Sequence, residues 1–499
     1  MDNNKSISIK RIINARRWQT GLILGLAIVL VLAAARFAFR DDLPGAIITF
    51  GLPALLVVPP LCVLLALHWR KTFYLVVLAL VFEGMVRNLT GQVAVLLFKD
   101  FLLGLVYLGY LYECGWKFTR QPVFRVFNIA FVMLIVYSLL EMLNPNLPDV
   151  TVGIIGLKTL LFYIPLIYIA YEVMPDPEKV HRFAVVLFGL TFISCLFGIY
   201  QYLGGREVIQ VFQPIHVTET YGSRGELVSY KVPGTFASAS NFSGLLYISF
   251  SLAMGLVYSK ISRTLTVLSL CTVVLTGSMF VINSQRAGLV YILLCFLLGT
   301  FAYSTNNWFR ILRGTLAGLL VIAFLIAIST EDNAIGTRFA QFTSSDGLQS
   351  YLISSPVDQI GSQLEALGSG RLFGLGIGAG APGARHILGD AYVFVESFIA
   401  LMLFEMGPIG LVLTAGLIAC LTLFSWRAYR GSKGEPLHNL NFFSFIWIMY
   451  MLVSSITYAP LMVPPASHFF WLLPGIALRI HAGSKQVAVK TGQLEGKAA

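Results

Sequence analysis

The sequence predicts an all-α integral membrane protein, a bundle of about 14 transmembrane helices that forms one membrane domain over residues 1–499. Apolar runs of about 20 residues, the length that crosses the hydrocarbon core of a bilayer, recur along the chain. Hydrophobic residues make up 57% of the chain and charged residues only 12%, whereas soluble domains carry about a quarter charged residues. The charges lie between the apolar runs, so the net charge of +11 does not indicate a nucleic-acid partner.

The first apolar run follows a basic N-terminal segment and has no obvious small-residue cleavage site. We therefore interpret it as an uncleaved first helix and not as a signal peptide. Each later span is placed on a further apolar run that is long enough to cross the bilayer. The expected spans are, in chain order, 19–39, 45–67, 72–87, 89–112, 124–142, 151–172, 181–203, 236–258, 263–283, 287–304, 313–329, 392–425, 438–458 and 462–480.

Basic residues set the expected orientation. With the N-terminus in the cytoplasm, most of the 35 Lys and Arg residues fall on the cytoplasmic side, including those of the tail 481–499. The positive-inside rule therefore predicts that both termini are cytoplasmic. Two long connections, 204–235 and 330–391, are then extracytoplasmic loops, and both are rich in Gly, Ser and other polar residues. We expect 330–391 to act as a mobile lid over a site.

Arg286 is the first of several cations on the outer side for which topology gives no reason. It lies in INSQRAG, between two hydrophobic runs. A guanidinium held there costs at least about 2.5–3.5 kcal/mol unless it is paired. The alternative is an arginine that snorkels to the interface from a helix end, but the turn around it is only a few apolar or small residues long. We therefore predict that Arg286 contacts an anion.

Two more cations, Arg224 and Lys231, lie in YGSRGELVSYKVPGTFASASNFSGLL, directly before an expected span. Small residues and amides at the start of that span leave backbone N–H groups that favour an anion. The alternative is a solvated loop in which Arg224 simply pairs with Glu226. Lys158, in TVGIIGLKTLLFYIPL, has no obvious local partner and is expected to line the same cavity as Arg286.

Alternating glycines fill GRLFGLGIGAGAPG at residues 370–383. A dinucleotide-binding loop would need a preceding strand, a following helix and an acidic residue further on, and none of these fits an outer loop. The glycines instead predict a tight, close-packed backbone that leads into the next span. Arg371 begins this segment and Arg338 lies earlier in the same loop, so both are candidate anion contacts.

Two glutamates follow in AYVFVESFIALMLFEMGPIGL. Glu396 lies at the outer end of a span, where it is a partner of the helix dipole, a partner of an outer arginine, or a general base whose pKa is raised by partial burial. Glu405 lies deeper, before Gly407 and Pro408, and is expected to be structural, beside a kink.

The remaining polar groups indicate structural roles. The outer histidines His386 and His468 are expected to be ordinary solvated loop residues. The outer side has no HExxH or paired-carboxylate spacing, and none of the six cysteines lies in a long outer loop. We therefore expect no metal, no other cofactor and no disulfide framework. Opposite charges near one another in the early spans are expected to form buried ion pairs that hold helices together. They are Lys99 with Asp100 and Glu83 with Arg87.

Four of these segments, taken in order, resemble the O-antigen ligase and Wzy-type polysaccharide polymerase superfamily. They are YKVPGTFASASNFSG, NSQRAGL, GSGRLFGLGIGAG and VESFIALMLFEMGPIGL, within roughly residues 220–425. The resemblance implies a GT-C-like, multi-spanning glycosyltransferase of the bacterial inner membrane. Such enzymes take a glycan linked to undecaprenyl pyrophosphate at the outer face and pass it to an acceptor hydroxyl, without a metal or a nucleotide sugar.

The resemblance also implies roles for individual residues. Arg286 resembles the arginine at the membrane edge that meets the pyrophosphate, and Lys231 stands where an arginine is common. The expected catalytic residues are Arg286 and Glu396, the latter as acceptor of the proton from the incoming hydroxyl. The residues expected to bind pyrophosphate or glycan are Arg286, Lys231, Arg224, Arg338, Arg371 and Lys158.

The superfamily's ligases carry His-Asn where this chain has Glu396-Ser397, which favours a polymerase. The expected function is to join lipid-linked oligosaccharide repeats into an exopolysaccharide, capsule or O-antigen in the bilayer, with chain-length regulators or export proteins as further partners. The alternatives are a ligase that transfers glycan to a different acceptor, and a transporter or flippase for lipid-linked glycan. A transporter predicts repeat-related halves and broken helices near the midplane, and the sequence has no such halves.

Overall fold

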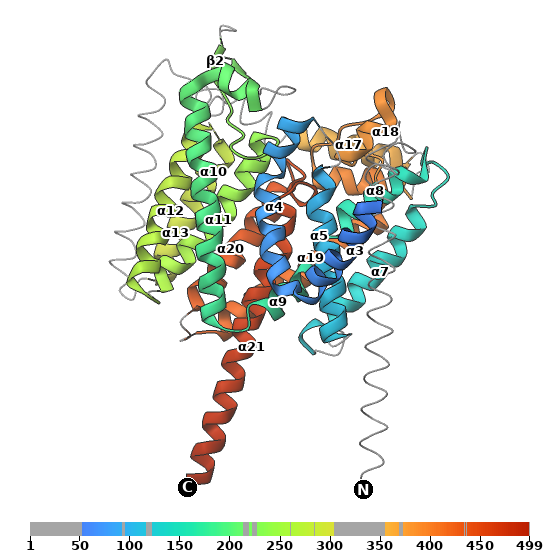
Figure 1. Ribbon diagram of the computed structural model, residues 1–499. Coiled ribbons are helices and arrows are strands. Elements are labelled where there is room, and N and C mark those ends of the chain that lie inside the picture. The colour runs from blue at the N-terminus through green and yellow to red at the C-terminus, as the bar shows by residue number, and fades with distance from the viewer. Residues whose placement is uncertain are drawn as a thin grey trace. The chain divides into compact units, whose positions relative to one another are not determined.

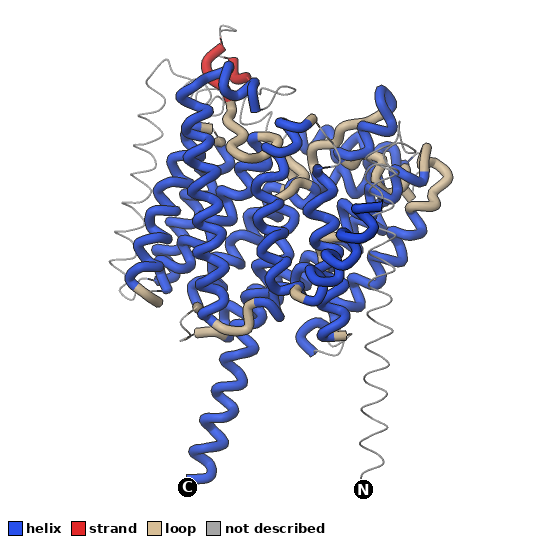
Figure 2. Tube along the Cα trace, viewed as in Figure 1, coloured by secondary structure: helices blue, strands red, loops and turns tan. Residues whose placement is uncertain are grey.

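The structure is a computed structural model in which helices dominate (Figure 2). It describes residues 52–91, 95–115, 122–212, 219–221, 227–259, 261–283, 285–303, 355–368, 373–433, 435 and 437–498. The chain divides into two compact units. The smaller comprises Met1–Phe124 with Thr235–Ala237, and the larger comprises Arg125–Gly234 with Ser238–Ala499.

The described part of the smaller unit consists of three helices and a short 3-10 turn. They are α3 (Leu52–Leu67), α4 (Trp69–Thr90), α5 (Val95–Cys114) and η2 (Pro122–Phe124). Lys99 of α5 lies with its Nζ 2.8 Å from Glu83 Oε2 of α4 and 3.9 Å from Asp100 Oδ2. The three side chains are at most 8% exposed. Buried ion pairing between the early helices is confirmed, but the expected partner of Glu83 was wrong: among the described residues Glu83 pairs with Lys99 and not with Arg87.

The segment Thr235–Ala237 joins the smaller unit through α4. The amide of Met85 donates to the carbonyl of Thr235 at 2.9 Å. A Cβ on Gly84 would overlap the backbone of Phe236 and Ala237, so only glycine permits this approach.

The larger unit contains the remaining elements (Figure 1). They are α7 (Arg125–Glu141), α8 (Val150–Leu161), α9 (Leu166–Val173), α10 (Pro177–Phe212), β1 (Glu219–Tyr221), β2 (Leu227–Tyr230), α11 (Ala239–Ser259), α12 (Arg263–Ile282), α13 (Arg286–Tyr303), α17 (Ser355–Gly368), η4 (Pro382–Ala384), α18 (Arg385–Leu388), η5 (Gly389–Ala391), α19 (Phe398–Gly431), α20 (His438–Ser454), η6 (Pro460–Met462) and α21 (Ala466–Ala498).

Helix α11 packs against α10, α12, α13, α20 and α21, and most of its residues are buried. Aromatic rings join it to α13 and α20: the Tyr450 ring centroid lies 5.0 Å from that of Tyr247 and 4.4 Å from that of Tyr291. A second close contact joins α9 to α21, where a Cβ on Gly475 would overlap the carbonyl oxygen of Ile167. Large apolar rings and small residues at contact points pack these helices tightly.

Six helical segments in the described residues are long and apolar enough to cross a membrane. They are Trp69–Thr90, Val150–Val173, Pro177–Phe212, Ala239–Ser259, Arg263–Ile282 and Phe398–Gly431. These segments support an all-α membrane protein. The expected spans 263–283 and 287–304 correspond to α12 and α13. The expected spans 19–39 and 313–329 lie outside the described residues.

The expected span 151–172 matches the crossing segment Val150–Val173, which is interrupted between α8 and α9. Pro165 lacks an amide hydrogen, and its ring clashes with the carbonyl four residues earlier, so the α-helical hydrogen bonds are interrupted there. The freed Leu161 carbonyl accepts from the amide of Ile164 at 3.2 Å, which is a tighter 3-10 turn.

The two long loops expected at 204–235 and 330–391 contain secondary structure where the chain is described. Within 204–235, α10 continues through a kink at Gly205, whose φ is +64°, and β1 pairs antiparallel with β2. Within 330–391 lie α17 and α18. In the larger unit, the hairpin, α17 and α18 lie at the same end, at the top of Figure 1, and α21 runs toward the other end.

Candidate functional site

A carboxamide fixes the segment that follows Lys231. The Asn283 side chain, 1% exposed, accepts from the amide of Val232 at 2.7 Å and donates to the Val232 carbonyl at 3.1 Å. Asn283 follows the last residue of α12, and Arg286 begins α13 three residues later. The contact therefore places the backbone next to Lys231 against the turn that leads to Arg286.

A second carboxamide, that of Gln201, binds the backbone of Gly234, two residues after Val232. Gln201 of α10 is fully buried; its Nε2 donates to the Gly234 carbonyl at 3.1 Å, and its Oε1 accepts from the Gly234 amide at 2.9 Å. Non-helical backbone inside a helix bundle needs such partners, because its N–H and C=O groups cannot reach water. The sequence reasoning missed Asn283 and Gln201; the available signal was an amide side chain inside or at the end of an apolar span.

Only some of the cations that were expected to bind an anion lie in the part of the chain that the structure describes. Lys231 is half-buried beside the Val232 contact, and Arg286 is the first residue of α13. Arg224, Arg338 and Arg371 lie outside the described residues.

The glycine-rich segment packs its backbone directly on α19. Gly374, Gly376 and Gly378 have φ values of +67°, +97° and +93°, which L side chains rarely adopt. The amide of Gly376 donates to the carbonyl of Glu405 at 3.0 Å. A Cβ on Gly374 would lie 2.7 Å from the backbone of Glu405. The expectation of a tight, close-packed backbone is confirmed.

Glu405 anchors this segment. Its side chain is 1% exposed, and its Oε1 accepts from the amide of Gly380 at 2.9 Å. Two residues later α19 is kinked at Gly407, whose φ is +62°, and the Tyr137 hydroxyl donates to the Met406 carbonyl at 2.8 Å. The structural role expected for Glu405 beside a kink is confirmed.

Helix α8, which carries Lys158, also packs on the glycine-rich segment. A Cβ on Gly156 would overlap the backbone of Gly378, and a Cβ on Gly378 would overlap the carbonyl oxygen of Val152. The Lys158 ammonium lies 5.9 Å from the centroid of the Tyr163 ring, close enough for a cation–π contact.

A hydrogen bond to its backbone amide holds Glu396 in place. The side-chain oxygen of Gln359, on α17, accepts from the amides of both Glu396 and Ser397 at 3.1 Å. The next amide, Phe398 N, donates to the Ser455 carbonyl at 3.0 Å. The Glu396 side chain is exposed, so the partial burial expected of a general base is absent. The reason is position: Glu396 precedes the first residue of α19, and its side chain is exposed among the described residues.

His468 was expected to be solvated, and that expectation is wrong. It lies in the first turn of α21 and is 3% exposed, with its ring centroid 3.9 Å from that of Tyr163. The signal was present in the sequence, because His468 is followed directly by the apolar run FFWLL inside an expected span. His386 is exposed, as expected.

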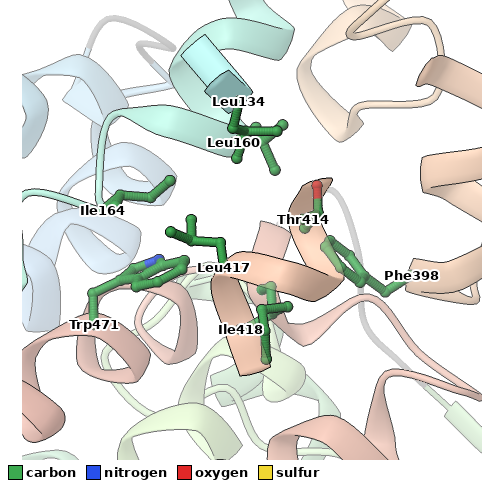
Figure 3. Close-up of a pocket in the computed structure, with 9 residues that line it drawn as sticks. Leu134, Leu160, Ile164, Phe398, Thr414, Leu417, Ile418 and Trp471 are labelled. Carbon is green, nitrogen blue, oxygen red and sulfur yellow. The ribbon is translucent and has the colours of Figure 1, made fainter. Parts of the chain in front are cut away.

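A narrow apolar cavity lies between α7, the α8–α9 break, α19, η6 and α21 (Figure 3). Its described lining residues are Leu134, Leu160, Ile164, Phe398, Thr414, Leu417, Ile418, Leu461 and Trp471. The cavity is small, with little more room than one water molecule needs. It reaches from Phe398 at the start of α19, two residues after Glu396, to Ile164, the residue after Tyr163.

Three ordered features lie at or near the ends of helices. The first is the Lys231 segment, residues 231–234, which Asn283 and Gln201 hold near the start of α13. The second is the glycine-rich segment packed on Glu405, and the third is the group formed by Lys158, Tyr163 and His468. Cations next to ordered backbone amides can bind and orient an anion. No protein-family profile and no curated protein sequence matches the chain.

Proposed function

We propose that the protein is a membrane glycosyltransferase that polymerises oligosaccharide repeats linked to undecaprenyl pyrophosphate, at the outer face of the bacterial inner membrane. In this proposal the chain has about 14 spans in a GT-C-like arrangement, both termini are cytoplasmic, and the hairpin, α17 and α18 face outward. The product is a surface polysaccharide such as an exopolysaccharide, a capsule or an O-antigen.

One observation carries the proposal. The Asn283 contact ties the Lys231 segment to the turn before Arg286, although the two are more than 50 residues apart in the chain. These segments are two of the four on which the resemblance to O-antigen ligases and Wzy-type polymerases depends. A third, the glycine-rich segment, is packed on the fourth through Glu405.

The chemistry explains why cations are needed. The acceptor oxygen forms a bond to the anomeric carbon, the bond from that carbon to the lipid diphosphate breaks, and the hydroxyl proton passes to a base. Negative charge builds on the departing diphosphate, and guanidinium or ammonium groups already in position stabilise it. We assign this role to Arg286 and Lys231, with Arg224, Arg338 and Arg371 as further loop cations.

We assign the proton acceptor to Glu396. An exposed carboxylate is a weak base at neutral pH, so the role requires that the bound glycan or α17 covers Glu396 during the reaction. Gln359 already connects α17 to the Glu396 backbone, which supports such an arrangement.

One observation is compatible with the transporter alternative. The span Val150–Val173 is interrupted between α8 and α9, and transporters bind substrate at broken helices. The two functions differ in the covalent product, because a transporter moves the lipid-linked repeat without lengthening it.

The test uses purified protein in lipid nanodiscs, supplied with a defined lipid-linked repeat, with the products sized on a gel. Wild-type protein should produce a ladder of lengthened glycans. Arg286→Ala should abolish the ladder while the protein still inserts and folds. The matched control is Arg263→Ala, an exposed arginine that begins α12, and it should retain the ladder. Unlengthened repeats with wild-type protein would overturn the proposal, and movement of repeats across a sealed vesicle would favour the transporter.

A further inference from the structure

A buried tyrosine lies where the span Val150–Val173 is interrupted. Tyr163 is one of the four residues between α8 and α9, where Pro165 interrupts the α-helical hydrogen bonds. Its side chain is 2% exposed.

Two groups that can carry positive charge approach this tyrosine. His468 stacks on it at 3.9 Å between ring centroids, with the planes tilted by 35°. The Lys158 ammonium lies 5.9 Å from the same ring centroid. The Ser467 hydroxyl lies 3.2 Å from His468 Nδ1 and adds a fourth polar atom. A lysine and a histidine inside an apolar bundle are expensive, and such residues usually mark a site.

Neighbouring residues connect the group to α11 on one side and to the apolar cavity on the other. A Cβ on Gly244, in the second turn of α11, would lie 3.2 Å from the amide of Ala466, two residues before His468. Helix α11 begins at Ala239, further along the chain from Lys231. On the other side, Ile164 and Trp471 face the apolar cavity that Phe398 also lines, and Figure 3 shows both close to Leu417.

We propose that Lys158, Tyr163 and His468 form a second site, which binds a phosphate group. An ammonium, a phenol and an imidazole supply three hydrogen-bond donors, and a phosphate supplies matching acceptor oxygens. Lys158 is half-buried, so one edge of the group is open, while Tyr163 and His468 close the other. The phosphate comes from a lipid headgroup or from free pyrophosphate. The inference rests on the proposed function for why this chain meets either one.

Binding is tested by thermal unfolding of the full chain in phosphatidylcholine nanodiscs, because a ligand that binds the folded state raises Tm with its concentration. One arm adds inorganic pyrophosphate, and the other includes a polyprenyl phosphate in the bilayer. Lys158→Met and His468→Phe should each weaken binding about tenfold or more. Phenylalanine keeps the ring stack on Tyr163, and Lys158→Arg, which keeps the charge, should retain binding.

Matched controls are Lys179→Met and His181→Phe, two half-buried residues of α10 in the same unit, which should leave the Tm shift unchanged. A shift with only the lipid probe identifies a headgroup site, and a shift with only pyrophosphate identifies a site for the free anion. The inference fails if neither probe raises Tm, or if Lys158→Met and His468→Phe bind like wild type. Formation of the glycan ladder is measured separately. If the protein makes polymer but neither probe raises Tm, the second site is rejected and the proposed function is retained.

Discussion

At the scale of single residues, the Asn283 side chain orders the segment that follows Lys231 through two hydrogen bonds to Val232. Asn283→Ala leaves the amide and the carbonyl of Val232 buried without their partner. Each such group costs about 1–3 kcal/mol, so we expect a loss of stability of at least about 2 kcal/mol. Asn283→Asp keeps the acceptor and should lose less. Denaturant unfolding in detergent measures both.

The control for this prediction is Asn146→Ala, which removes an exposed amide side chain. It should change stability little, because an exposed side chain exchanges one set of water contacts for another. Equal stability of Asn283→Ala and Asn146→Ala would contradict the role given to Asn283.

Asp149 offers a pH-dependent test outside the spans. Its Oδ1 accepts from the amide of Thr151 at 2.7 Å at the start of α8, and this hydrogen bond lowers the pKa of the carboxyl below its usual 3.8. Because the pKa is lower in the folded than in the unfolded state, the cap contributes fully above the unfolded-state pKa, and its contribution is lost as pH falls through the folded-state pKa. Amide exchange at Thr151 should therefore lose protection in acid.

Asp149→Asn provides the comparison, because an asparagine cap accepts the same hydrogen bond and does not titrate. Its Thr151 exchange, after correction for intrinsic rates, should show no such loss of protection in acid. The same acid dependence in both proteins would exclude Asp149 as its source.

The role of a residue could be predicted from the sequence where its neighbours in the chain determine that role. Glu405 was expected to be structural because a Gly-Pro pair follows it, and the kink at Gly407 confirms this. The burial of His468 and the exposure of Glu396 were not predicted, because burial depends on which helix packs over a position. That information comes from contacts between distant parts of the chain.

At the scale of elements, the glycine-rich segment and α8 depend on each other. Gly378→Ala would place a methyl group against the carbonyl of Val152 at a φ of +93°. The backbone strain alone costs about 1–3 kcal/mol, and the overlap adds to it. We expect a lower Tm and a loss of the glycan ladder, measured on the same preparation.

Gly416→Ala is the matched control. Gly416 lies within α19 with nothing within 4 Å of an added Cβ, so alanine should be neutral or slightly stabilising. If Gly378→Ala unfolded at the temperature of Gly416→Ala, the close packing of this segment would not matter for stability.

The positions of most described helices followed from hydropathy, because an apolar run needs only its own residues to predict a span. The expected starts of α12 and α13 lie within a residue of those observed. The break at Pro165 could have been predicted from the proline alone. Helix α17 and the β1–β2 hairpin could not, because polar loop composition does not fix local structure.

At the scale of the whole molecule, each unit has its own buried polar centre. In the larger unit this centre consists of Asn283, Gln201 and Glu405, whose side chains bind backbone groups that are distant in the sequence. In the smaller unit the centre is an ion pair between α4 and α5, formed by Lys99 and Glu83. An ion pair between helices makes the smaller unit sensitive to loss of one charge, since the remaining ion is left buried.

Lys99→Met should therefore destabilise the smaller unit by about 3–5 kcal/mol, the range found when one partner of a buried pair is removed. Lys99→Met combined with Glu83→Gln should recover part of the stability, since both buried charges of the 2.8 Å pair are gone.

The control is Arg70→Met, which breaks the exposed Arg70–Glu113 pair and should cost at most about 1 kcal/mol. Unfolding of the wild type and the three variants in detergent makes the comparison. A Lys99→Met loss no larger than that of Arg70→Met would show that the buried pair does not hold α4 to α5.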